Sequence, residues 1–291
     1  MNSLSYLGHS GLITKSNINH LIYELKPNIN AYYRLVPFRT NSKGLRDREY
    51  QISKSKGIFR VAVIGDSYTM ATGVKIDEAY HSLLESKINN EKRKLDYEFI
   101  NFGVGGYNLK QYMTVIEFKA NQYDPDLILI GFCPENDHQI PPEGIFERPY
   151  NEPRRTYSFY ESFVIKKVTQ KFRHDTIKRL SKTSVNEFSE EEKEYMSRLF
   201  LKMRDYSQEY DIPIVVVYLS HIYNEIYVKN LRELVESNSL NFIDASLTFK
   251  DIPNLNQYLI YLTDSHPNNK ANRIFADRIY KYLNAGYFLD K

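Results

Sequence analysis

Tryptophan is missing from this chain of 291 residues, cysteine occurs only once, and neither sign of charge prevails. The single Cys133 excludes an intrachain disulfide and any metal site built from several cysteines, and we interpret it as a buried structural thiol. The chain has 39 lysine and arginine residues and 36 acidic residues, which gives a net charge of only +3. This charge does not indicate a nucleic-acid-binding protein. With 42% hydrophobic residues, the chain is expected to be globular with a substantial core.

Long hydrophobic runs are also missing. The longest ones, DLILIGF and IPIVVVYL, are far shorter than the ~20 residues that span a bilayer. The N-terminus has no basic start followed by a long apolar run, so it does not read as a signal peptide. A single cysteine fits a reducing compartment. We therefore expect a soluble, cytoplasmic protein without a membrane span.

From Ile58 onward the sequence alternates between short apolar runs and amphipathic segments. The runs are continuous, which is typical of strands buried on both faces of a sheet. They cover residues 58–65, 97–102, 126–132, 212–219 and 240–244. Apolar residues at helical spacing occur in residues 80–88, 195–203 and 271–282. The pattern predicts a three-layer α/β/α, flavodoxin-like fold with a five-stranded parallel sheet, whose ligands bind beyond the carboxyl ends of the strands.

Two segments interrupt this alternation. Residues 1–57 show little periodicity, and we interpret them as an N-terminal extension packing on a domain of residues 58–291. Residues from about 138 to 188 are too long for an ordinary connection and predict an inserted helical segment or lid. Between Arg154 and Lys182 this insertion holds nine basic and two acidic residues. That excess indicates a solvated helical face, a lid that attracts an anionic substrate, or a protein contact.

The first apolar run leads directly into Gly65-Asp66-Ser67. A serine in this place exposes its hydroxyl at the carboxyl edge of the sheet, and a helix following it would point backbone N–H groups at the same spot. A serine hydroxyl is a poor nucleophile until a base takes its proton. The ordinary alternative is that Asp66 or Ser67 caps the next helix.

Among the seven histidines, His266 is the best placed to act as that base. It lies in the polar segment YLTDSHPNN, after the fifth strand and before the last helix. This segment is expected to return to the same edge of the sheet as the end of the first strand. Asp264 would orient its ring. His138 and His221 also follow strands and are competing candidates. In the plainer interpretation, Asp264 and Asn268 are turn and cap residues and His266 is simply exposed.

An acyl-transfer site also needs donors aimed at the oxyanion of its tetrahedral intermediate. The segment NFGVGGYN, after the second strand, supplies glycines whose N–H groups a ligand approaches closely. The segment GFCPENDH, after the third strand, supplies the side-chain amide of Asn136. Each segment alone is an ordinary turn or loop. Together, the serine, glycine, asparagine and histidine all belong at one edge of the sheet.

With these four blocks the chain resembles the SGNH (GDSL) hydrolase family, which is named for those residues. The blocks read VIGDSYTMATGV, INFGVGGYN, PENDH and DSHPN. Gly106 best fits the family's oxyanion glycine, and Gly103 is the alternative. The lead-in TNSKGLRDREY is also similar to a bacterial branch associated with extracellular polysaccharide genes. The resemblance covers residues from about Asn41 to Tyr282, without the insertion.

One position departs from the family pattern. The family usually places its acid three residues before the histidine, where this chain has Thr263, whereas Asp264 stands two residues before His266. Either Asp264 plays the same role, or Ser67 and His266 act as a dyad helped by a backbone carbonyl.

The resemblance implies a serine esterase that needs no cofactor and no metal. Ser67 would attack the ester, His266 would transfer the proton, and Asp264 would orient His266. The N–H groups of Ser67 and Gly106, with the side chain of Asn136, would stabilise the oxyanion. The implied substrate is an O-acetyl or short acyl ester on a carbohydrate. Two alternatives are an O-acyltransferase that uses the same serine and a catalytically inactive glycan-binding module.

Overall fold

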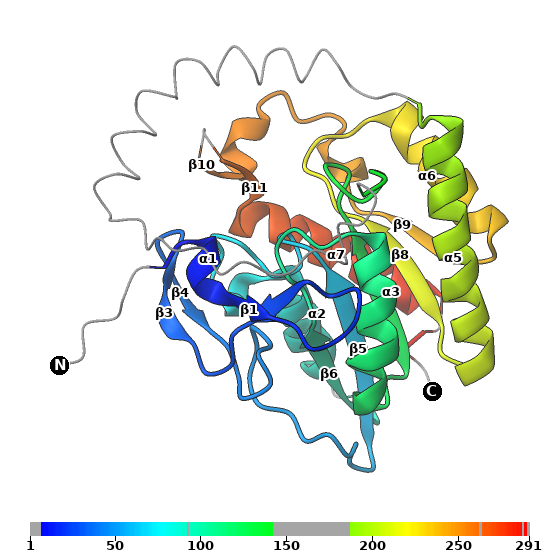
Figure 1. The fold of residues 1–291 in the computed structure, drawn as a ribbon. Helices are drawn as coiled ribbons and strands as arrows, with labels where there is room; N and C mark the ends of the chain where they lie inside the picture. The colour runs from blue at the N-terminus through cyan, green and yellow to red at the C-terminus, as the bar shows by residue number, and fades with distance from the viewer. Residues whose placement is uncertain (1–6, 92, 142–186, 262–263, 287, 290–291) are drawn as a thin grey trace.

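The computed structural model describes residues 7–91, 93–141, 187–261, 264–286 and 288–289. At its centre is a sheet of five parallel strands in the order β6-β5-β7-β8-β9 (Figure 1). These strands are β5 (Ile58–Gly65), β6 (Asp96–Asn101), β7 (Leu127–Phe132), β8 (Ile214–Tyr218) and β9 (Asn241–Asp244). Each coincides with one of the apolar runs to within two residues at either end. The predicted α/β fold with a five-stranded parallel sheet is confirmed.

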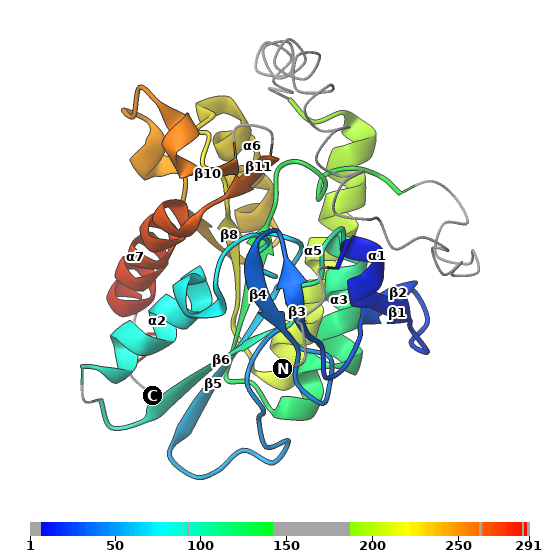
Figure 2. The ribbon, with the colours of Figure 1, turned by 90° about the vertical axis from the view of Figure 1, so that its left-hand side faces the viewer.

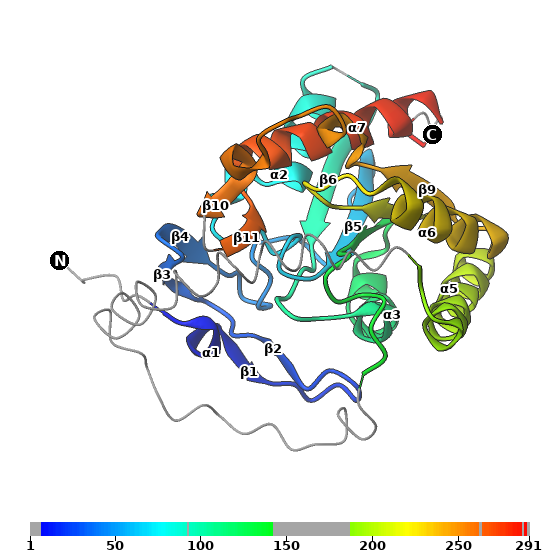
Figure 3. The ribbon, with the colours of Figure 1, turned by 90° about the horizontal axis from the view of Figure 1, so that it is seen from above.

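Helices cover both faces of the sheet (Figure 3). One layer consists of α2 (Tyr80–Asn89) and α7 (Asn269–Ala285). The opposite layer consists of α3 (Leu109–Phe118), α5 (Glu190–Tyr210) and α6 (Glu225–Ser237). The short 3-10 helices are η1 (Ile76–Glu78), η2 (Ala120–Tyr123), η3 (Leu247–Phe249) and η4 (Leu255–Tyr258).

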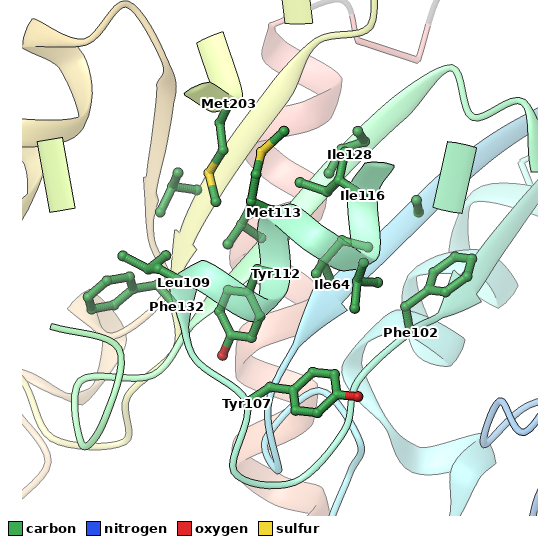
Figure 4. Packing of buried hydrophobic residues seen from close by; sticks show 14 of the residues in the cluster. Ile64, Phe102, Tyr107, Leu109, Tyr112, Met113, Ile116, Ile128, Phe132 and Met203 are labelled. Carbon is green, nitrogen blue, oxygen red and sulfur yellow. The ribbon is translucent and has the colours of Figure 1, made fainter. Parts of the chain in front are cut away.

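The core has two parts because successive side chains of a strand point to opposite faces of the sheet. In β5, Val61 and Val63 pack against the α2 and α7 layer. Ile64 packs on the other side, against the layer that contains α3. Figure 4 shows this second part, where Ile64 and Ile128 of the sheet lie beneath side chains of α3.

Local signals explain where the helices begin. At α5, the Ser189 hydroxyl accepts a hydrogen bond from the Glu192 N–H at 3.1 Å, and the Glu192 carboxylate accepts one from the Ser189 N–H at 2.8 Å. These two reciprocal bonds form a capping box. Side chains of Asn108 and Asn224 cap α3 and α6, two helices that the sequence analysis did not name.

The N-terminal region, residues 7–57, consists of a short helix and two hairpins. Its elements are α1 (His9–Leu12), β1 (Ile13–Lys15), β2 (Tyr23–Leu25), β3 (Asn30–Tyr33) and β4 (Val36–Arg39), paired β1 with β2 and β3 with β4. In Figure 3 the first hairpin lies on the same side of the sheet as α3. Strands of three or four residues are too short to show a hydrophobic period, which is why this part of the sequence looked aperiodic.

A third small sheet lies next to the tip of the β3–β4 hairpin (Figure 2). It pairs β10 (Leu259–Tyr261) with β11 (Asp264–Pro267) in antiparallel fashion. The Tyr261 hydroxyl donates a hydrogen bond to the Arg34 carbonyl at 3.1 Å, which joins this sheet to the hairpin.

The insertion expected at about 138–188 falls largely on residues 142–186, outside the described residues, as does its basic stretch between Arg154 and Lys182. None of the helices within the described ranges is both long and apolar enough to cross a membrane.

Candidate active site

Ser67 lies on a turn that sits directly on the end of the sheet. Gly65 ends β5 and pairs with Gly131 of β7. The Thr69 hydroxyl fills the space above both glycines, since a Cβ would lie 2.1 Å from it at Gly65 and 2.4 Å at Gly131. The turn can therefore approach the strand ends closely only because both positions lack a side chain.

Ser67 caps no helix in this structure. Residues 66–73 form turns, so the helix that would have pointed N–H groups at Ser67 is not present. The Asp66 carboxylate stabilises the turn by accepting a hydrogen bond from the Tyr68 N–H at 2.8 Å. The Ser67 N–H has no hydrogen-bond partner among the described residues.

The Ser67 hydroxyl belongs to a chain of three hydrogen-bonded side chains. Its oxygen lies 2.9 Å from His266 Nε2. His266 Nδ1 lies 2.5 Å from Asp264 Oδ1 on the other side of the ring. His266 lies in β11 and not in a loop, and 22% of its side chain is exposed. Thr263 lies outside the described residues.

Asp264 is held by a second partner that the sequence did not indicate. Its Oδ2 lies 2.8 Å from Nη1 of Arg34, at the tip of the β3–β4 hairpin. Burial alone would raise the pKa of Asp264, but the hydrogen bond from His266 and the charges of His266 and Arg34 outweigh it and lower that pKa below its usual value. The carboxylate is thus kept ionised and fixed in direction.

Neither of the two competing histidines bonds the Ser67 hydroxyl among the described residues. His138 Nδ1 lies 3.2 Å from the Tyr227 hydroxyl, away from Ser67. His221 is buried, and burial together with the charge of His266 lowers its pKa to about 4. Among the described residues, His266 is the histidine within hydrogen-bond distance of the Ser67 hydroxyl.

The two candidate oxyanion glycines differ in whether their N–H groups are in use. The Gly103 N–H donates a hydrogen bond to Asn101 Oδ1 at 2.9 Å. The Gly106 N–H has no partner among the described residues. Gly106 has a φ of +83°, a left-handed conformation that favours glycine. The geometry thus favours Gly106 over Gly103 as a donor to a ligand.

Asn136 lies on a turn after β7, beside the glycine loop. Its side-chain amide donates a hydrogen bond to the Tyr107 carbonyl at 2.7 Å. An amide nitrogen carries two protons, so one remains available to a ligand. The same bond fixes the distance between this turn and the glycine loop.

Buried polar groups support the turn that carries Asn136. The Asp137 carboxylate accepts hydrogen bonds from the Cys133 N–H at 2.7 Å and from the Tyr112 hydroxyl at 3.0 Å. Burial raises the pKa of the Cys133 thiol well above its usual value, so this cysteine is neutral. Within the described ranges, no cluster of three or more histidine, cysteine or acidic side chains is arranged to hold a metal ion.

No protein-family model matches the sequence, and no curated protein is significantly similar to it. Solved structures are similar. TesA superposes with a TM-score of 0.50 at 12% identity, over 78% of this chain and 98% of TesA. The fold is that of the SGNH hydrolases.

Two further solved structures match with lower TM-scores. The acetyl xylan esterase AlAXEase has a TM-score of 0.47 at 17% identity, over 77% of this chain and all of that protein. A two-domain esterase (CEX) active on acetylated mannans has a TM-score of 0.48 at 15% identity, over 80% of this chain and 49% of the esterase.

Proposed function

We propose that this protein is a serine esterase of the SGNH type that works through a covalent acyl-serine intermediate. One observation carries the proposal: the Ser67 hydroxyl, His266 and Asp264 form a continuous hydrogen-bonded chain at the carboxyl edge of the sheet. A cap or turn serine has no need of a histidine at 2.9 Å that is itself bonded to a buried carboxylate.

The proposed reaction has two halves. In the first, Ser67 Oγ attacks the ester carbonyl carbon while His266 Nε2 takes its proton, and His266 then delivers that proton to the leaving alcohol. In the second, His266 Nε2 takes a proton from water as the water oxygen attacks the acyl-serine carbonyl carbon. His266 then returns that proton to Ser67 Oγ as the bond between Oγ and the acyl carbon breaks and the acid departs. Asp264 holds the His266 tautomer that keeps Nε2 free to accept the first proton.

The same oxyanion forms in both halves and needs donors that are already in place. The Ser67 and Gly106 N–H groups have no other partner among the described residues, and Asn136 has one amide proton to spare. We assign these three groups to the oxyanion hole. No step of this reaction uses a metal or an organic cofactor.

For the substrate we propose an O-acetyl or short acyl ester on a carbohydrate. The support is the resemblance of the four blocks to the SGNH family and of the TNSKGLRDREY lead-in to its bacterial branch associated with polysaccharide genes. We further propose that residues 58–291 form the hydrolase domain and that residues 1–57 pack on it.

Reaction with a fluorophosphonate tests the nucleophile directly. Intact-protein mass is expected to show one adduct, absent in Ser67→Ala, slowed in His266→Ala and unchanged in Ser197→Ala, which removes a hydroxyl on α5. No adduct on folded wild-type protein would leave a catalytically inactive binding module as the better interpretation. If labelling succeeds, hydrolysis of p-nitrophenyl acetate with and without added oligosaccharide distinguishes the two enzyme classes, since only a transferase would acetylate the sugar.

A further inference from the structure

We infer that Tyr23, in the N-terminal region, is a positioning residue that sets the direction of the Gly106 N–H in the oxyanion hole. This role rests on the proposed function. Tyr23 lies on β2, more than forty residues before Ser67, outside every block that resembles the family.

The Tyr23 hydroxyl donates a hydrogen bond to the Gly105 carbonyl oxygen at 2.8 Å. That carbonyl belongs to the same peptide unit as the Gly106 N–H. The described chain contains no cis peptide bond, so the C=O and N–H of this unit point in opposite directions. By holding the carbonyl toward β2, Tyr23 turns the Gly106 N–H away from the N-terminal region and toward the sheet edge with Ser67.

This peptide unit needs an external hold because glycine flanks it on both sides. Two consecutive glycines offer little steric resistance to rotation of the peptide plane between them. A flipped plane would present the Gly105 carbonyl oxygen, in place of an N–H, to the developing negative charge. A hydrogen bond to the carbonyl in only one orientation selects the catalytically useful one.

Hydrogen bonds fix the loop on both sides of the Gly105–Gly106 peptide unit. Rotation of this peptide plane is therefore the main motion that they leave open. Before this unit, the Gly103 N–H bonds Asn101 and the Val104 N–H donates to the Gly65 carbonyl at 3.1 Å. After it, the Tyr107 carbonyl accepts from Asn136. Figure 4 shows Tyr107 on the loop that connects Phe102 to α3.

Tyr23 is itself well placed to act as a fixed support. The Tyr107 hydroxyl donates a hydrogen bond to the Tyr23 carbonyl, and the two rings pack at 5.5 Å between centroids. The ring of His9 packs edge-on against Tyr23 and also forms a hydrogen bond with the backbone of Gly105, so it supports Tyr23 in holding this part of the loop. A Cβ on Gly106 would lie 2.8 Å from the Tyr23 hydroxyl oxygen, so the contact leaves no room for a side chain.

The test compares Tyr23→Phe with Tyr206→Phe. Tyr206 is a matched control, because it is a buried tyrosine on α5 whose hydroxyl bonds Asn121 at 2.9 Å, before the amino end of β7. With p-nitrophenyl acetate, Tyr23→Phe is expected to lower kcat about tenfold with KM within about twofold, less than the loss of a whole oxyanion donor. Fluorophosphonate labelling of Ser67 should slow by a similar factor. Tyr206→Phe should leave both rates near those of the wild type.

The outcomes separate the inference from the function on which it rests. If wild-type Ser67 is not labelled, the proposed function fails. If the wild type is labelled and Tyr23→Phe keeps its kcat and labelling rate, the positioning role alone is overturned. A raised KM with unchanged kcat would likewise overturn it, because that split indicates a general loosening of the site.

A measurement on the wild type covers the case in which Tyr23→Phe does not fold. In protein with 15N-labelled glycine, the phosphonyl adduct on Ser67 is expected to shift the Gly106 N–H signal strongly and the Gly103 signal weakly, since the latter stays bonded to Asn101. An unshifted Gly106 signal on fully labelled protein would remove the donor that Tyr23 is proposed to orient.

Discussion

The two oxygens of Asp264 have different partners, and this gives the residue its significance. Oδ1 bonds the His266 ring and Oδ2 bonds the Arg34 guanidinium. Because each oxygen of the carboxylate has its own partner, the orientation of the carboxylate is fixed. Asp264 therefore places an oxygen at His266 Nδ1 although it stands two residues before His266, and not three as is usual in the family. The spacing in this sequence therefore still allows the contact between Asp264 and His266.

Asp264→Asn tests whether the site works as a triad or as a dyad. An amide in this position cannot hold the same His266 tautomer, so kcat for p-nitrophenyl acetate is expected to fall about 10²- to 10⁴-fold. The measurement is steady-state hydrolysis together with the rate of Ser67 labelling. Activity within about threefold of the wild type would favour a Ser67–His266 dyad.

Arg34→Gln is expected to raise the pKa of the Asp264 carboxylate, which NMR titration of 13C-labelled aspartate measures as a shift of the pH titration profile of Asp264 to higher pH. The arginine helps to hold the pKa of Asp264 below its usual value, so its removal lets the carboxylate take up a proton at higher pH, where the wild type still has it ionised. At neutral pH the expected loss of kcat is only a few-fold.

Arg48→Gln is the control for this pH profile. Arg48 pairs with Glu85 at 2.6 Å, so its loss also removes one arginine–carboxylate bond, but from a pair that includes neither His266 nor Asp264. The same Asp264 titration in Arg34→Gln and in the wild type would contradict the role given to Arg34.

Ser67, Asn136 and His266 could be selected from the sequence because each stands just beyond a strand or just before a helix that the hydrophobic pattern predicts. Arg34 and Tyr23 could not. Their contacts cross 230 and 82 residues of chain, and the hairpins that carry them are too short to be seen as strands. No local pattern in the sequence reports a contact of that kind.

At the scale of elements, α2 supports the turn that carries Ser67. The Tyr80 hydroxyl lies 2.9 Å from the Thr69 hydroxyl. Its neighbour His81 is fully buried, and burial, with the charge of Arg46 next in importance, lowers the pKa of His81 from 6.5 to about 3. The folded protein therefore keeps His81 neutral at pH values where the unfolded chain protonates it.

This burial makes stability depend on pH. Because the unfolded state binds the extra proton, His81 is expected to lower the free energy of unfolding by about 1.4 kcal/mol per pH unit as the pH falls from 6.5 toward 3. His221, with a pKa of about 4, adds a loss of the same sign. Urea unfolding of wild type and His81→Gln at pH 7 and pH 5 checks this, and the variant should lose less stability between the two. Equal losses would mean that His81 is protonated in the fold.

The strands and helices differ in how clearly the hydrophobic pattern of the sequence predicts them. The five core strands are buried on both faces and therefore occur in the sequence as continuous apolar runs, which predict them directly. Helix α3 has buried residues on almost every side, among them Gln111 and Thr114, so it lacks the polar face that marks an amphipathic helix. Helix α6 does carry an apolar stripe at Tyr227, Leu231 and Val235, a helical spacing that is visible in the sequence.

At the scale of the whole molecule, the N-terminal region contacts three segments of the candidate site. Arg34 holds Asp264 and Tyr23 holds the glycine loop. Arg46, which is 1% exposed, donates hydrogen bonds to the carbonyls of Met70 and Val74 at 2.7 Å each and to the Ala71 carbonyl. The segment TNSKGLRDREY thus supplies a cation to the turn after Ser67.

Arg46→Met is expected to be among the most damaging substitutions outside the site itself. Burial lowers the pKa of Arg46 only to about 10, so it remains a cation at neutral pH. Replacing it leaves several buried carbonyls without a donor, which is expected to cost about 3 kcal/mol or more of the free energy of unfolding. Arg46→Lys should fall in between, because one ammonium group cannot reach carbonyls spread over five residues.

Urea unfolding and the rate of Ser67 labelling measure the two consequences of Arg46→Met separately. If the N-terminal region were a passive covering, Arg46→Met would lower stability while folded protein kept the wild-type labelling rate. If it is part of the active-site scaffold, the turn carrying Ser67 shifts when its carbonyls lose their donor, and labelling slows even under conditions where the variant is fully folded. We expect slower labelling, because the N-terminal region contacts three segments of the site.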